Sequence, residues 1–319
     1  MKYVGIDLGG TNIVAGIVDD EGKILCQVER PTGNTRPFAE VAKDMALAAV
    51  EAIEKAGLTP ADVEGIGIGV PGAIDHVNGR ATAVNLGWHM EPVRDEMQKV
   101  INLPIHMDND GNAAALGEIM VGSMKGAKDA VFITLGTGVG GGLMVNGKML
   151  RGAHSVAGEI GHMNSMLYGG IDCNCGQQGC WEKYTSATAL IAFAREAMEQ
   201  HPDCLIAQKT GGDKAKVNAK VVIDAAKEGD AVALKLFNDY AYALGRGIAS
   251  LIHILDPEVV ALGGGVSRAG DFLLDAVREQ VKKCVMHPDM PYARVELATL
   301  GNEAGLIGAA MLCAEAAEK

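Results

Sequence analysis

The order in which strands and a helix follow one another near the start of the chain restricts the fold most strongly. Residues 3–8 run apolar with β-branched side chains, and further strand patterns follow at residues 13–18 and 24–28. Because only short turns join these three segments, they must pair as antiparallel neighbours. Apolar residues at helical spacing predict a helix over residues 38–56, and residues 66–70 have the pattern of a buried strand. This order is typical of an α/β fold with helices packed on the faces of a sheet.

A similar order of elements recurs later in the chain. The sequence predicts a strand over residues 130–135, a hairpin around residues 143–147, a long helix over residues 231–255 and another strand over residues 259–262. The two halves therefore look like variations of one unit, a β-hairpin followed by helix and strand. A chain of 319 residues is long enough for two such domains.

Three glycine-rich turns follow buried strands, with the sequences DLGGTN (residues 7–12), TLGTGVGGG (134–142) and ALGGGVS (261–267). Each alone fits plain architecture equally well. Together they indicate a nucleotide site, because glycine lets backbone N–H groups approach phosphate oxygens closely. None matches the Walker pattern, and the first joins two antiparallel strands instead of a strand and a helix. Asp7 precedes the first turn and is a candidate to position a phosphate-bound magnesium ion through water.

The segment EIGHMNSMLYGGIDCNCGQQGCWE, residues 159–182, contains four side chains that bind metals well: His162, Cys173, Cys175 and Cys180. One imidazole and three thiolates suit the tetrahedral coordination of zinc, and the neighbouring glycines allow the backbone to fold tightly around it. The alternatives are a loop of reduced thiols or a disulfide. Because the CxC spacing differs from the commoner CxxC, metal binding alone does not name a function.

Composition and charge exclude several classes of protein. Hydrophobic residues make up 48% of the chain and charged residues 21%, so the protein is globular and not disordered. The net charge of −12 and the lack of a basic cluster argue against nucleic acid as a partner. No apolar run approaches the ~20 residues of a membrane helix. The four cysteines outside the cluster lie far apart, which fits a reducing compartment, and we expect a cytoplasmic protein.

A candidate proton acceptor lies in the stretch IHMDNDGN, residues 105–112, where a strand pattern runs into a helical one. A carboxylate at that junction lies near the positive end of the helix, which keeps it ionised and ready to accept a proton. Strand alternation puts Asp108 and Asp110 on one side, so periodicity does not choose between them. A purely structural interpretation makes Asp110 the N-cap of the helix, which stabilises it by ~1 kcal/mol.

These features together resemble the actin-like ATPase and sugar-kinase superfamily, and within it the ROK family. The turn at residues 7–12 resembles the first phosphate loop, and residues 134–142 with 155–162 resemble the family signature. The stretch GGIDCNCGQQGCWE at residues 169–182 matches the zinc loop of the family almost residue for residue. The resemblance runs from Tyr3 to the final helix. Residues 71–75 and 85–88 look most like those of the bacterial ATP-dependent glucokinases.

The resemblance implies an actin-like ATPase or hexokinase-type two-domain α/β fold, built on ribonuclease H-like repeats and carrying a zinc-binding loop. It places the first phosphate loop, the base and the C-terminal helix in a small domain of residues 1–117 plus about 303–319. Residues 118–302 then form a large domain with the zinc loop, the sugar-recognition residues and the adenosine-side loop. The cleft between the domains is expected to close over the sugar and exclude water.

The resemblance also assigns residues to nucleotide and metal. It implies that ATP and its magnesium ion are held by the three turns, through Asp7, Gly9, Gly10, Thr11, Asn12, Gly136, Thr137, Gly138, Gly263, Gly264 and Gly265. One zinc ion per chain is expected on His162, Cys173, Cys175 and Cys180. Since the protein fills all four ligand positions, this zinc is structural and does not activate water.

For the sugar, the family motif makes Asp110 the general base and Asn109 a contact to a sugar hydroxyl. Glu159 and His162 are three residues apart and face the same way on a helical turn. One nitrogen of His162 binds zinc and the other donates to a sugar oxygen. By resemblance Glu159, His162 and Glu182 bind the ring hydroxyls. Asn85 adds another contact, and Gly72 belongs to the same set of substrate-binding residues.

The expected reaction is the phosphorylation of D-glucose at its 6-hydroxyl by ATP, with Asp110 removing the proton. One alternative is a ROK kinase for another hexose: fructose, mannose or an N-acetylhexosamine. A more distant one is a sugar-responsive ROK regulator; such relatives carry an added N-terminal DNA-binding domain, which we do not expect here because the strand of the first phosphate loop begins at residue 2. Family resemblance further suggests a homodimer or homotetramer.

Overall fold

The computed structural model describes the whole chain except residues 34, 167, 318 and 319. Its contacts divide it into two compact units. The first contains Met1–Ala127, Gly142–Gly158 and Thr299–Lys319, and the second contains Lys128–Gly141 and Glu159–Ala298. The chain thus passes from one unit to the other after Ala127, Gly141, Gly158 and Ala298. The segment Gly142–Gly158, which our sequence boundaries place in the large domain, belongs to the first unit by this division.

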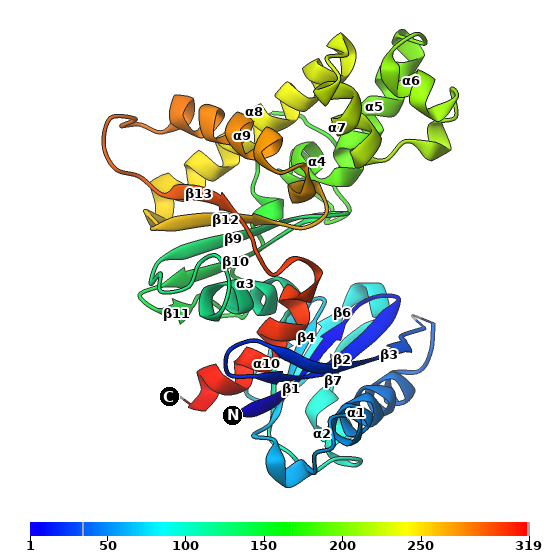
Figure 1. Cartoon of the computed structure of the whole chain (residues 1–319), viewed down its shortest axis with the longest axis vertical. Helices are drawn as coiled ribbons and strands as arrows, with labels where there is room; N and C mark the ends of the chain where they lie inside the picture. The colour runs from blue at the N-terminus through cyan, green and yellow to red at the C-terminus, as the bar shows by residue number, and fades with distance from the viewer. Residues whose placement is uncertain (34, 167, 318–319) are drawn as a thin grey trace. The chain divides into compact units, whose positions relative to one another are not determined.

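The first unit contains a five-stranded mixed sheet of order β3-β2-β1-β4-β8 (Figure 1). Strands β1 (Lys2–Leu8), β2 (Asn12–Asp19) and β3 (Ile24–Pro31) are antiparallel, as their short turns require. Strands β4 (Ile66–Val70) and β8 (Ile105–Asn109) continue the sheet in parallel with β1. The carboxyl ends of β1, β4 and β8 therefore meet at one edge of the sheet.

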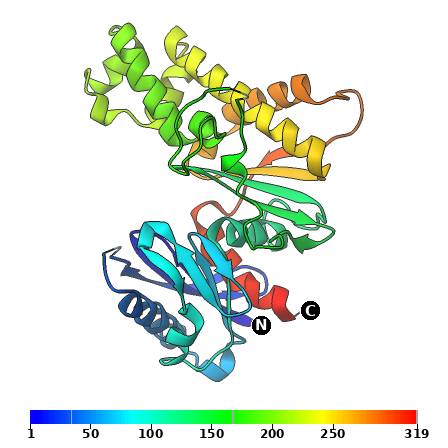
Figure 2. The same ribbon diagram turned by 180° about the vertical axis from the view of Figure 1, so that it is seen from behind.

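One face of this sheet packs against helix α1 (Phe38–Lys55), which ends one residue before the predicted boundary. Its apolar stripe includes Met45 and Ile53, which lie in one core with Val4 and Ile6 of β1. The unit also contains α2 (Val93–Gln98), α3 (Asp110–Met120) and a small sheet of β5 (Ala73–Asp75), β6 (Arg80–Ala83) and β7 (Trp88–Glu91), drawn in cyan and seen from behind in Figure 2.

The C-terminal helix α10 (Ala304–Ala317) packs against β1, β4 and α3. It approaches the strands closely because they carry glycine there. A Cβ added to Gly5 would lie 2.2 Å from the Leu306 carbonyl oxygen, and one added to Gly67 would lie 1.7 Å from that of Ala309. Side chains alternate along β1, so Val4 and Ile6 point to the α1 face while Gly5 admits α10 on the other.

The second sheet has the order β11-β10-β9-β12-β13. Strands β9 (Ala130–Leu135), β12 (Val259–Gly263) and β13 (Arg294–Leu297) are parallel, and β10 (Val139–Val145) forms a hairpin with β11 (Lys148–Met149). The order of strands along the chain in the two sheets is the same, position by position. The predicted repetition of one α/β unit is therefore confirmed.

The helices of the second unit are α4 (Glu182–Thr185), α5 (Ala187–Gln200), α6 (Leu205–Thr210), α7 (Ala219–Lys227), α8 (Ala231–Leu255) and α9 (Asp271–Cys284). Helix α8 has the predicted bounds. Trp181 is buried against it, because a Cβ at Gly247 would lie 2.1 Å from the indole ring, and its Nε1 donates to the Ala243 carbonyl at 2.9 Å. No helix within the described part of the chain is long and apolar enough to cross a membrane.

Candidate active site

The first glycine-rich turn is held in place by a residue that the sequence did not single out. The turn closes through the backbone N–H of Gly9, which donates to the Asn12 carbonyl at 2.9 Å. Thr32, fully buried, donates its hydroxyl to the Gly9 carbonyl at 2.7 Å and its N–H to the Thr11 carbonyl at 2.7 Å. Around Gly10 there is space, with the amide nitrogen of Asn85 3.9 Å from an added Cβ. The structure thus places Asn85 beside the turn.

At the carboxyl edge of the first sheet, Asp7 is paired in register with Gly69, and Gly69 with Asp108. Gly72 follows β4 and has a φ of 136°, and its carbonyl accepts a hydrogen bond from Asn109 Nδ2 at 3.1 Å. An added Cβ there would lie 2.1 Å from the Thr82 carbonyl oxygen. The fold of this edge therefore places Gly72, Asn109 and Asp7 on the carboxyl side of neighbouring strands.

The two aspartates of this stretch differ in where they lie relative to the end of the strand. Strand β8 stops at Asn109, which is the N-cap of α3: its Oδ1 accepts from Gly111 N at 2.8 Å and Asn112 N at 3.3 Å. Asp110 is the first residue of the helix, is exposed, and accepts from Gly111 N at 2.9 Å. Its carboxylate therefore lies at the positive end of α3, where the helix stabilises the ionised form. The interpretation of Asp110 as the N-cap is wrong.

Asp108, in contrast, is only 1% exposed and is engaged by an ion pair. Arg151 Nε lies 2.6 Å from its Oδ2, and the same guanidinium binds Glu315 at 2.7 Å. Asn112 Nδ2 donates to Oδ1 of Asp108 at 2.9 Å. These contacts hold Asp108 in the core and attach it, through Asn112, to the start of α3.

The carboxyl of Asp7 has a raised pKa. Burial, together with the negative charge of Asp110, raises the pKa of its carboxyl from 3.8 to about 6. The start of α10 also lies against it, since a Cβ on Gly305 would come within 2.6 Å of its Oδ2. Two carboxylates that repel each other favour a cation, so the residues present fit the magnesium ion of a nucleotide.

In the second unit, the turn at Gly136, Thr137 and Gly138 is bound from two sides. Glu182 Oε2 accepts from Val139 N at 2.9 Å and would lie 2.2 Å from a Cβ on Gly138. The N-terminal residues of α5 also bind it: Ala187 N donates to the Gly136 carbonyl and the Thr188 hydroxyl to that of Thr137. Glu182 therefore contacts the backbone at the second turn as well as standing next to the metal loop.

The third turn lies beside the second because β9 and β12 are parallel neighbours. Gly264, at a φ of +84°, packs onto the backbone of Leu135, with an added Cβ 2.6 Å from both its nitrogen and its oxygen. Gly263 is paired with Thr134, whereas Gly265 and Gly136 have open space around them. The unit thus brings Gly136–138 and Gly263–265 to the same edge of its sheet.

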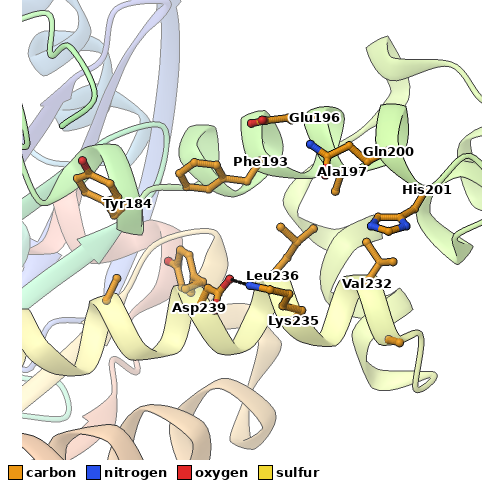
Figure 3. Close-up of a pocket in the computed structure, with 13 residues that line it drawn as sticks. Tyr184, Phe193, Glu196, Ala197, Gln200, His201, Val232, Lys235, Leu236 and Asp239 are labelled. Atoms are coloured by element: carbon orange, nitrogen blue, oxygen red, sulfur yellow. Dashed lines mark hydrogen bonds and ion pairs between the residues drawn. The ribbon is translucent and has the colours of Figure 1, made fainter. Parts of the chain in front are cut away.

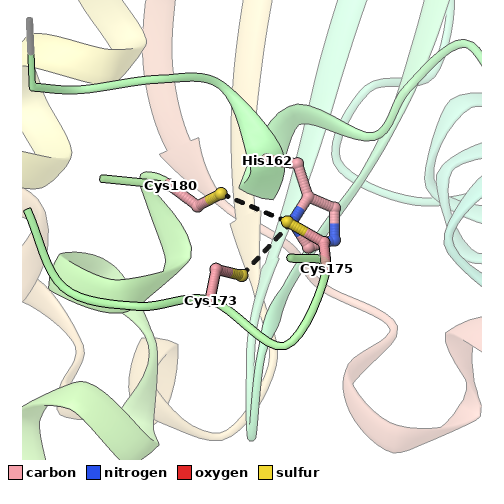
Figure 4. A group of neighbouring side chains, drawn as sticks. All are labelled: His162, Cys173, Cys175 and Cys180. Atoms are coloured by element: carbon pink, nitrogen blue, oxygen red, sulfur yellow. Dashed lines mark hydrogen bonds between the residues drawn. The ribbon is translucent and has the colours of Figure 1, made fainter. Parts of the chain in front are cut away.

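The four predicted metal ligands converge, as Figure 4 shows. Their donor atoms all lie within 4.8 Å of one another, with Cys173 Sγ 3.7 Å from His162 Nδ1 and Cys175 Sγ 3.5 Å from Cys180 Sγ. Ligands at ~2.0–2.3 Å around a tetrahedral zinc are separated by about 3.5–3.8 Å, so the donor set fits zinc. All seven cysteines of the chain are free, which excludes the disulfide alternative in this structure.

Glu159 and His162 belong to a single turn of 3₁₀-helix, η3 (Ile160–His162), for which Glu159 is the N-cap. The N–H of His162 donates to the Glu159 carbonyl at 3.0 Å, and both side chains are exposed. Nδ1 of His162 faces the thiols, which leaves Nε2 for another partner.

A hollow of about 580 Å³ in the second unit lies between α5 and α8 (Figure 3). Tyr184, Phe193 and Leu236 line it, and Lys235 forms an ion pair with Asp239 at 2.6 Å. None of the predicted site residues is part of its lining. This hollow is therefore separate from the predicted site residues.

Comparison with known proteins places these features in a family. A sequence model described as the ROK family matches residues 3–316. A protein of Halalkalibacterium halodurans named glucokinase is 40% identical over 97% of this chain and 94% of its own length, and a glucokinase of Thermotoga maritima is 37% identical over 99% and 98%. The crystal structure of a ROK family glucokinase from Streptomyces griseus, in complex with glucose and AMPPNP, superposes with a TM-score of 0.84 at 36% identity, over 99% of this chain and 100% of that one. The chain belongs to the ROK family, and its fold is the ROK hexokinase-type α/β fold.

Proposed function

We propose that this protein is an ATP-dependent glucokinase, which transfers the γ-phosphoryl group of ATP to the 6-hydroxyl of D-glucose. The observation that carries the proposal is the exposed carboxylate of Asp110 on the first residue of α3, beside the N-cap Asn109, in a chain related over nearly its whole length to glucokinases. Asp110 would accept the proton of the 6-hydroxyl as that oxygen attacks the phosphorus.

Phosphoryl transfer depends mainly on positioning and on neutralising phosphate charge. We assign the first task to the turns at residues 7–12, 136–138 and 263–265, whose backbone N–H groups would bind phosphate oxygens, with the last turn on the adenosine side. Asp7 would hold the nucleotide's magnesium ion through water. Magnesium, when bound, neutralises charge on the phosphates.

For the sugar, we assign Asn85, Asn109, Glu159, His162 and Glu182 to its hydroxyls, with Gly72 supporting Asn109 through its carbonyl. Zinc on His162, Cys173, Cys175 and Cys180 would be structural, because the protein supplies all four ligands. Its role in the site is to orient His162 so that Nε2 is available to the sugar. Domain boundaries near residues 117 and 303 stay part of this proposal, as does a cytoplasmic location, which the scattered cysteines support.

The nearest competing function is a ROK kinase for another hexose. Initial rates of ADP release, coupled to NADH oxidation, should be measured with glucose, fructose, mannose and N-acetylhexosamines. The proposal predicts the highest kcat/KM for glucose. A higher value for any other sugar would reject glucose as the substrate, and sugar binding without ADP release would favour a regulator.

A further inference from the structure

Glu118, near the end of α3, is a fully buried carboxylate that accepts hydrogen bonds from neutral donors. Its Oε2 accepts from Ser123 N at 2.8 Å, Ser123 Oγ at 2.9 Å and Thr299 Oγ1 at 3.3 Å, and its Oε1 accepts from Leu300 N at 2.7 Å. Among the described residues no lysine or arginine forms an ion pair with it. Burying an ionised carboxylate is unfavourable unless hydrogen-bond donors surround it. The four donors around Glu118 therefore stabilise its buried side chain.

The partners of Glu118 lie where the chain changes units. Ser123 belongs to the last residues of the first segment, which ends at Ala127, and Thr299 and Leu300 are the first residues after the return at Ala298. The segment that follows another crossing also contacts α3. Gly142, the first residue after Gly141, would place an added Cβ 2.3 Å from Ala115 Cβ. Helix α3 thus contacts the segments next to three of the crossings, those after Ala127, Gly141 and Ala298.

The same helix begins with Asp110. At a rise of 1.5 Å per residue, Glu118 lies about 12 Å along the axis from Asp110. A well-packed helix moves as one body, because close packing leaves little room for it to deform. Any change in how the crossing segments bind the end of α3 is therefore carried to the carboxylate at its start.

We propose that Glu118 is a positioning residue for the phosphoryl transfer. It fixes α3 to the crossing segments and thereby sets the place of Asp110 relative to the reacting hydroxyl. This inference rests on the proposed function of Asp110 as the base. It predicts a specific pattern, in which loss of Glu118 lowers the rate of the chemical step more than the affinity for the sugar.

The test is Glu118→Gln. Whichever way the amide is turned, its NH₂ group faces a backbone N–H, that of Ser123 or that of Leu300, so one pair of donors must separate. Because a displacement of about 1 Å at a reacting group can lower the rate up to 100-fold, we expect kcat to fall about tenfold or more. The Kd for glucose, measured calorimetrically, should weaken less than about threefold, since most of the proposed sugar contacts lie outside α3.

A less disruptive variant can be tested if Glu118→Gln does not fold. The double variant Ser123→Ala/Thr299→Val removes two hydroxyl donors and leaves both backbone donors, and should lower kcat in the same direction by a smaller factor. Gly122→Ala displaces the Glu118 carboxylate by steric conflict, because the added Cβ would lie 2.2 Å from Glu118 Oε2. Ile53→Ala, in the core beneath α1, is the control for lost stability, and its kcat should be unchanged where it is folded.

Wild-type kcat in Glu118→Gln, or in the double variant where Glu118→Gln is not folded, would overturn the inference. An equal fall of kcat in Ile53→Ala would do the same, because the effect would then be one of stability. Failure of the proposed function is a different result: the wild-type protein itself would release no ADP with glucose.

Discussion

At the scale of single residues, three carboxylates set the charge of the candidate site: Asp7, Asp108 and Asp110. Arg151 pairs with Asp108, while Asp7 and Asp110 repel each other. Burial together with that repulsion raises the pKa of Asp7 to about 6. The site is therefore arranged to gain from a bound cation and destabilises the protein without one.

The raised pKa of Asp7 predicts a pH-dependent effect of Asp7→Asn on stability. Well below pH 3.8 the carboxyl is protonated in folded and unfolded chains alike, so it contributes nothing to the pH dependence. Between pH 3.8 and about 6 the unfolded chain loses this proton while the folded protein keeps it, so the folded protein is progressively destabilised, by up to about 3 kcal/mol above pH 6. Asp7→Asn removes this cost, so the variant should be more stable than the wild type at pH 7 and equal to it near pH 4.

Urea denaturation of metal- and nucleotide-free protein at several pH values measures this difference. The difference in free energy of unfolding should grow between pH 4 and pH 6.5 and then level off. A variant that is less stable than the wild type at pH 7 would show that the Asp7 charge is favourably bound in the free protein.

At the scale of elements, the metal loop and the C-terminal helix each bring distant parts of a unit together. The loop gathers His162 from η3 with three cysteines that follow it. Burial raises the pKa of the Cys180 thiol to about 12, and a cysteine must lose its proton to become a zinc ligand. The loop is therefore expected to depend on its metal for its shape.

Cys175→Ser should remove the metal. Wild-type protein is expected to contain about one zinc per chain, and the variant much less, because serine is a poor zinc ligand. If zinc orients His162, KM for glucose should rise more than kcat falls. Cys284→Ser, outside the cluster, is the matched control and should retain zinc. Elemental analysis showing equal zinc in both variants would contradict the assignment.

Gly308→Ala tests the packing of α10 on α3. Its Cβ would lie 1.7 Å from the Ala113 carbonyl oxygen, which is backbone and cannot rotate away. The helices must separate, and we expect a loss of about 1–3 kcal/mol in the free energy of unfolding. Ala317→Ser, at the exposed end of the same helix, should change it by less than about 0.5 kcal/mol. Equal urea midpoints for Gly308→Ala and the wild type would refute this packing.

Elements whose signals are local could be predicted from the sequence, and contacts between distant residues could not. Helix α8, the strands around each glycine turn and the metal ligands all follow from periodicity, turn chemistry or ligand spacing. Alternation failed to separate Asp108 from Asp110, because β8 ends between them. Thr32, Glu118 and Arg151 carry no local pattern; their roles come from partners such as Gly9, Leu300 and Glu315, which only the fold brings near.

At the scale of the whole molecule, the chain repeats one sheet topology twice, and each copy presents glycine-rich turns or carboxylates at the carboxyl edge of its parallel strands. Such edges are where open α/β sheets bind ligands. A single ancestral unit used twice would account for both the repeated strand order and the similar placement of the turns. The division of tasks proposed here gives the base to one copy and the metal loop to the other.

Family resemblance also predicts that the protein assembles as a homodimer or homotetramer. Sedimentation velocity over a range of concentrations, in buffer of physiological ionic strength, measures the mass directly. The expected species is two or four times the chain mass of 33.2 kDa. A single species at the chain mass over the whole range would show that the assembly prediction is wrong.

The most direct test of the account is Asp110→Asn, which keeps the shape of the side chain and removes its ability to accept a proton. Turnover of glucose and calorimetric binding of glucose should be measured on the same preparation. If Asp110 is the base, kcat falls by about 10²–10⁴-fold while the Kd for glucose changes little. A variant that binds glucose and retains wild-type kcat would contradict the account, because the proton would then leave by another route.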